Sequence, residues 1–132
     1  QIIEKRKSQL TIQFKDMLYS LSSALSVGKS VETGIQDALQ DLRVIYPDPE
    51  TDILVELEYI LRGIGMNNTV ESMFGQFAER AHLEDIENFT DIFVTCKRTG
   101  GDLIEVMRST SSTIGERRST PPYRERNSSL IP

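Results

Sequence analysis

One short turn recurs three times in this chain and constrains its fold more than any other feature. Each copy places a residue that ends a helix before a helix N-cap, an apolar residue and an acid. The copies are Gly28-Lys29-Ser30-Val31-Glu32, Asn67-Asn68-Thr69-Val70-Glu71 and Gly100-Gly101-Asp102-Leu103-Ile104-Glu105. Gly and Asn tolerate the left-handed backbone of a helix exit, and Ser, Thr and Asp accept from free N–H groups at the next helix start. Turns this short fold consecutive helices back on one another.

We therefore expect seven residues to serve as structural turns and caps. They are Gly28, Ser30, Asn67, Thr69, Gly100, Gly101 and Asp102. The acids that follow them suit the positive end of a helix dipole. Glu105 stands three residues after Asp102, which resembles a capping box. The repetition indicates either a duplicated hairpin or three independent turns that share an efficient form.

Apolar residues between these turns recur every three or four positions, as on the buried face of a helix. The spacing predicts six helices and no strand. We expect Asp48 to cap the third helix with Pro49 at its first position, and the fifth helix to start near His82 or Leu83. The fifth helix is expected to bury Ile86, Phe89, Ile92, Phe93 and Cys96. The predicted fold class is all-α, an antiparallel bundle of six helices made of helical hairpins, over residues 1–118. Residues 119–132 are interpreted as a linker or added sequence without ordered structure.

The 132 residues carry a net charge of −5, and the distribution of that charge is uneven. Basic residues gather in segments 1–7 and 117–132, while the body between them is acidic. An acidic body repels phosphate backbones, so nucleic-acid binding is not expected. Basic ends beside an acidic body are also what the positive-inside rule predicts next to membrane helices, although frayed or added termini give the same pattern. The single cysteine, Cys96, favours a reducing compartment.

Motifs that carry chemistry are weak in this sequence. Gly28-Lys29-Ser30 copies the end of a phosphate-binding loop, but Ser23 stands where that loop needs glycine and the preceding segment is helical. His82 is the only histidine, and Cys96 falls on an apolar stripe. We therefore predict no catalytic, cofactor-binding or metal-ligating residue, and no cofactor.

Two acidic clusters remain, and three interpretations are open for them. One contains Asp48, Glu50, Asp52, Glu56 and Glu58, and the other contains Glu84, Asp85, Glu87 and Asp91. They are solvated helix faces, an electrostatic docking face for a basic partner, or a contact for calcium or magnesium. The candidate partner-contact residues are Asp52, Glu56, Glu58, Glu84, Asp85 and Glu87.

Several motifs, taken together in order and spacing, resemble one known family. They are the run Gln13 to Ser23, Gly28-Lys29-Ser30-Val31-Glu32, Phe77-Ala78-Glu79-Arg80, Asp85-Ile86-Glu87-Asn88-Phe89 and Lys97-Arg98-Thr99-Gly100-Gly101-Asp102-Leu103. The chain resembles the type II secretion system F domain, in the branch of tight-adherence (Tad/Flp) pilus platform proteins, over residues 10–118. The family pattern falls on Gly28, Ser30, Arg80, Asp85, Gly100, Gly101 and Leu103. Arg80 and Asp85 would form either a bracing ion pair or a partner contact.

The resemblance implies a non-catalytic, six-helix cytoplasmic domain of a bacterial inner-membrane platform protein. Such proteins couple an assembly ATPase to extraction of pilin from the membrane in type IV or Flp pilus assembly and type II-like secretion. The implied partners are that ATPase and other platform subunits, with a homodimer possible, and the membrane segments would lie outside these residues. The sequence after Arg118 departs from the family.

Two other function classes stay open at this point. A soluble helical adaptor or regulatory protein would have no apolar spans of about 20 residues beside this segment in the full gene. An enzyme would require several of the carboxylates to converge in one pocket with raised pKa values.

Overall fold

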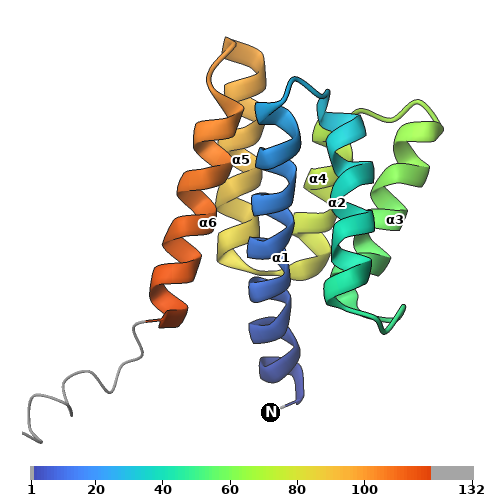
Figure 1. Ribbon diagram of the computed structural model, residues 1–132, viewed down its shortest axis with the longest axis vertical. Helices are drawn as coiled ribbons and strands as arrows, with labels where there is room; N and C mark the ends of the chain where they lie inside the picture. The colour runs from blue at the N-terminus through green and yellow to red at the C-terminus, as the bar shows by residue number, and fades with distance from the viewer. Residues whose placement is uncertain (1, 120–132) are drawn as a thin grey trace, which may run out of the picture.

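A computed structural model of the chain describes residues 2–119 and shows six helices (Figure 1). The helices are α1 (Ile2–Ser26), α2 (Val31–Ile45), α3 (Asp52–Gly65), α4 (Val70–Ala81), α5 (Glu84–Thr99) and α6 (Leu103–Ser119). There is no strand within residues 2–119. The predicted all-α, six-helix bundle is confirmed. Ser119 closes α6, and the predicted linker beyond it lies outside the described residues.

The helices run alternately up and down, and this places the turns in two groups (Figure 1). The connections α1–α2, α3–α4 and α5–α6 lie at one end of the bundle, which we call the turn end. The start of α1, the end of α6 and the connections α2–α3 and α4–α5 lie at the opposite end, which we call the terminal end. All three copies of the recurring turn are therefore on the same side of the molecule.

The predicted caps are confirmed in each of the three turns. Ser30 Oγ accepts from the Thr33 N–H at 3.1 Å, and Thr69 Oγ1 accepts from the Ser72 N–H at 3.0 Å. Asp102 Oδ1 accepts from the Glu105 N–H at 3.1 Å. Left-handed backbone precedes each cap, at Gly28 (φ 94°), Asn67 (φ 73°) and Gly100 (φ 77°). Local chemistry alone therefore fixes where three of the six helices begin.

The predicted start of α3 at Asp48 and Pro49 is wrong. Asp48 instead closes a turn: its carboxylate accepts from the Glu50 N–H at 2.9 Å, and its carbonyl accepts from the Thr51 N–H at 3.0 Å. Thr51 is the N-cap of α3 but makes no capping bond with its side chain. Gln13 on α1 supplies the missing acceptor, since its Oε1 lies 3.2 Å from the Ile53 nitrogen.

Five phenylalanines form the centre of the core, and all are at most 1% exposed. They are Phe14 on α1, Phe74 and Phe77 on α4, and Phe89 and Phe93 on α5. Their rings meet mostly edge to face, with centroids 5.2 to 6.1 Å apart, an arrangement that aromatic pairs prefer. These rings join α1, α4 and α5, so the N-terminal helix packs against helices far along the chain.

Ile92 departs from the predicted core of α5. It is 49% exposed, whereas Ile86, Phe89, Phe93 and Cys96 are buried. Ile92 stands about 100° around the helix from Phe93, at the edge of the buried stripe, and it opens onto a shallow surface groove instead of a neighbouring helix. The helix itself begins at Glu84, because His82 takes a left-handed conformation (φ 52°) that ends α4.

Candidate functional site

The three acidic candidates on α3 are each paired with an arginine of a neighbouring helix. Asp52 receives two hydrogen bonds from the Arg6 guanidinium, at 2.7 and 3.3 Å. Glu58 is 2.9 Å from Arg43, and Glu56 is paired with Arg80. These pairs join α3 to α1, α2 and α4 respectively. The α3 acids are thus bracing groups between helices and offer little unbalanced charge to a partner.

Asp85 is also paired internally, and the Arg80–Asp85 pair considered from the sequence is wrong. Asp85 lies 2.7 Å from Arg117 on α6, while Arg80 is paired with Glu56 on α3. Arg80 is in the last turn of α4 and Asp85 in the first turn of α5, and the two side chains turn to different neighbouring helices. Both residues therefore connect helices.

Glu84 and Glu87 are the candidates that stay exposed without an ion-pair partner among the described residues. They stand in the first turn of α5. Asp91, one turn after Glu87, is exposed in the same way. Unbalanced negative charge on this part of the molecule is therefore concentrated along α5.

The acidic candidates and the recurring turns lie at opposite ends of the bundle. Asp52 and Glu84 begin helices at the terminal end, whereas Ser30, Thr69 and Asp102 begin helices at the turn end (Figure 1). The 14-residue α3 separates its two ends by about 21 Å, at a rise of about 1.5 Å per residue.

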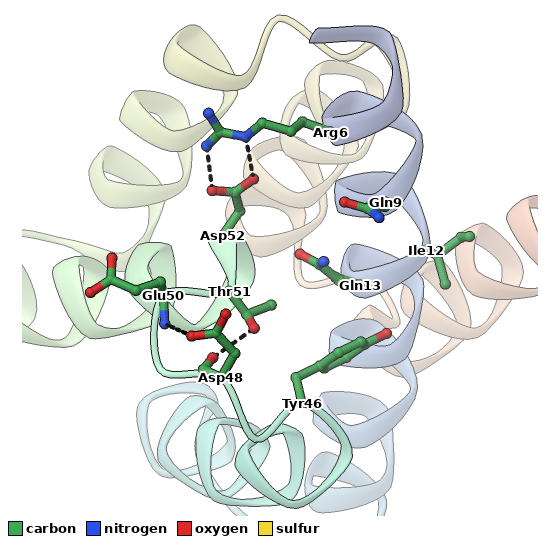
Figure 2. Close-up of a pocket in the computed structure, with 9 residues that line it drawn as sticks. All are labelled: Arg6, Gln9, Ile12, Gln13, Tyr46, Asp48, Glu50, Thr51 and Asp52. Carbon is green, nitrogen blue, oxygen red and sulfur yellow. Dashed lines mark hydrogen bonds and ion pairs between the residues drawn. The ribbon is translucent and has the colours of Figure 1, made fainter. Parts of the chain in front are cut away.

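An open pocket of about 670 Å³ lies at the terminal end, between α1 and the loop that joins α2 to α3 (Figure 2). Its lining consists of Arg6, Gln9, Ile12, Gln13, Tyr46, Asp48, Glu50, Thr51 and Asp52. Figure 2 shows Arg6 reaching across from α1 to Asp52 and the Asp48 carboxylate turned to the backbone of Glu50. The side chains that could hold a ligand are thus largely engaged in holding the loop to α1.

Tyr46 anchors this loop through a contact that the sequence did not predict. Its hydroxyl donates to Asp16 Oδ2 on α1 at 2.6 Å. Burial, together with the hydrogen bond and charge of Asp16, raises the pKa of Tyr46 well above its usual range. From the sequence, the Tyr46-Pro47-Asp48-Pro49 segment predicts only a break between helices. No local pattern relates Tyr46 to Asp16, which stands 30 positions earlier.

The apparent phosphate-loop residues act as a turn. Lys29 is ion-paired with Asp37, and the Ser30 hydroxyl caps α2. The segment before Gly28 is the helix α1, which leaves no strand-to-helix loop in which backbone N–H groups could converge on a phosphate.

Cys96 is a buried free thiol. Across residues 2–119, no group of three or more His, Cys, Asp and Glu side chains is arranged to hold a metal ion. In the same span, no helix is both long enough and apolar enough to cross a membrane.

Comparison with protein-family models, with curated proteins and with solved structures finds no match to this chain.

Proposed function

We propose that this chain is a non-catalytic docking domain from an inner-membrane platform protein of type IV or Flp pilus assembly or type II-like secretion. In this proposal the domain lies in the bacterial cytoplasm and receives an assembly ATPase, whose conformational change it passes to membrane-embedded segments and other platform subunits. The proposal extends the resemblance of residues 10–118 to the type II secretion system F domain.

The observation that carries the proposal is the position of the motif residues in the bundle. Ser30 and Gly100, on which the family pattern falls, are a cap and a helix exit at the turn end. The start of α1 and the end of α6 come out together at the terminal end (Figure 1). Membrane segments would join there, and the turn end would face away from the membrane.

Cross-bracing between helices supports a role in transmitting force. Ion pairs tie α3 to α1, α2 and α4, and others tie α5 to α4 and α6. The pairs are Arg6–Asp52, Arg43–Glu58, Arg80–Glu56, Lys97–Glu71 and Arg117–Asp85. The α6 hydroxyl of Ser111 also donates to the Lys15 carbonyl of α1 at 3.2 Å. In this proposal a load on one helix would be shared with its neighbours through these contacts.

The test is made on the full-length protein in its own cells. Membrane and soluble fractions are separated, and the protein is crosslinked in place and recovered by an affinity tag. We expect it in the inner-membrane fraction, crosslinked to the assembly ATPase encoded beside it. A full-length protein found in the soluble fraction, with no ATPase crosslinked, would contradict the proposal and favour the soluble adaptor.

A further inference from the structure

Three carboxylates on facing helices form an unneutralised patch between α4 and α5. Glu79 comes from α4, and Glu87 and Asp91 come from α5, where they are one helical turn apart. All three are exposed, and none has an ion-pair partner within the described residues. The acids on α3, by contrast, are each paired with an arginine. This patch therefore has charge to offer a partner.

The same three acids border a groove whose floor is made of small residues. The groove holds about 210 Å³ and is lined by Gly75, Ala78, Glu79, Glu87, Thr90 and Asp91. A Cβ atom added at Gly75 would meet nothing within 4 Å, so space is open directly above the α4 backbone. Because Gly75 has no side chain, the groove has room for a side chain of another molecule.

Thr90 gives the groove a polar group that has no partner. The residue is only 6% exposed, and its Oγ1 is the one buried side-chain oxygen or nitrogen in residues 4–117 without a hydrogen bond. A buried hydroxyl that lacks a partner is unfavourable, and such groups are rare in folded proteins. Thr90 itself lines the groove, and a change of χ1 rotamer moves its Oγ1 to a different staggered position around Cβ.

From these observations we propose that the α4–α5 groove binds an arginine or lysine side chain of a partner protein. The apolar stem would lie over Gly75 and Ala78, and the cationic head would face Glu79, Glu87 and Asp91. Its N–H groups would donate to the carboxylates and to the Thr90 hydroxyl. The inference rests on the proposed docking function and names the contact that this function would use.

The chemistry of the groove favours a basic side chain over other occupants. Phosphate-bearing ligands, nucleic acid included, are repelled by three unpaired carboxylates. The carboxylates are not arranged to hold a metal ion, whereas a long side chain with several N–H donors reaches all of them across a groove. The groove is also small, so it accepts one side chain at a time.

The experiment measures binding of a defined probe, a labelled glycine–serine peptide with three arginines, to the chain by NMR titration. We expect the largest shifts at backbone amides of Gly75, Ala78, Thr90 and Asp91. The Glu87→Gln/Asp91→Asn variant should weaken binding by roughly tenfold. Gly75→Leu, which fills the groove and leaves its charge intact, should weaken binding by at least as much. Thr90→Val should weaken binding and also raise stability, because it removes an unpartnered hydroxyl.

The matched control is Glu32→Gln/Glu50→Gln, which removes the same charge at exposed positions outside the groove. It should bind the peptide as the unaltered chain does. Equal weakening by the control, or unchanged binding by Gly75→Leu, would overturn the proposal, because the attraction would then be nonspecific. If the peptide binds in the groove but the assembly ATPase does not bind the chain, the groove proposal stands and the proposed function is wrong. If the ATPase binds and the groove variants do not weaken that binding, the proposed function stands and the groove proposal is wrong.

Discussion

The guanidinium of Arg80 lies 4.5 Å from the ring centroid of Tyr59 and at the same time binds the carboxylate of Glu56. Arg80 comes from α4, whereas Glu56 and Tyr59 come from α3. The Tyr59 hydroxyl completes the contact by donating to Gln76 on α4 at 3.1 Å. The junction of α3 with α4 is therefore fastened by an arginine that makes two kinds of interaction.

Replacing Arg80 by alanine should lower the free energy of unfolding by about 1–2 kcal/mol, because a cation–π contact and an ion pair are lost together. Urea denaturation of the purified chain measures the change. Arg108→Ala is the matched control, since Arg108 is exposed and has no described partner. If Arg80→Ala and Arg108→Ala have equal effects, the bracing role of Arg80 is wrong.

Gly75→Ala should stabilise the chain by about 0.5–1 kcal/mol, because a helical glycine is replaced where its new Cβ meets nothing. Gly34→Ala should act in the opposite direction. A Cβ at Gly34 would approach Leu21 Cδ1 to 2.6 Å, and Leu21 is fully buried, so the Leu21 side chain and its packing between α1 and α2 would have to shift. Thermal unfolding of the two variants side by side shows whether the changes have opposite signs.

Thr69→Ala should destabilise the chain by about 1 kcal/mol, because the Ser72 N–H loses its side-chain acceptor at the start of α4. Thr69→Ser keeps the hydroxyl and should retain most of the stability. Denaturant midpoints for the three proteins make the comparison. Equal losses for Ala and Ser would show that the methyl group, and not the cap, is responsible.

Tyr46→Phe should cost about 1 kcal/mol at neutral pH, since it removes the hydrogen bond to Asp16. The pKa of Tyr46 is raised by folding, so the stabilising effect of its hydroxyl is complete below its unfolded value of about 10. That effect is lost as the pH rises further, because a tyrosinate would face a carboxylate. The difference in unfolding free energy between the parent and Tyr46→Phe should therefore shrink above about pH 10. A difference that stays constant would contradict this account.

The sequence predicts contacts between neighbouring residues well and misses contacts between residues far apart in the chain. Ser30, Thr69 and Asp102 cap helices by bonding to a backbone N–H three residues away, so neighbouring residues suffice to identify them. Asp48 looked like the same kind of cap. That prediction is wrong, because the acceptor at the start of α3 comes from Gln13, 40 residues before Ile53, and no local pattern reveals this contact.

The candidate site was harder to predict for the same reason. Sequence identified the acidic residues on α3 and α5, but not which of them are paired with an arginine or which arginine that is. Arg6 and Asp52 are 46 residues apart, and Arg117 and Asp85 are 32 apart. Spacing on one helix shows that carboxylates share a face, whereas neutralisation depends on how the helices pack. The unpaired acids of the α4–α5 groove therefore became apparent only in the structure.

The central claim, that the chain docks an assembly ATPase, is tested most directly by calorimetric titration of the purified chain with that ATPase. The account predicts saturable binding that Glu87→Gln/Asp91→Asn weakens by roughly tenfold and that Glu32→Gln/Glu50→Gln leaves unchanged. Absence of binding to the unaltered chain, with the ATPase active and the chain folded, would contradict it.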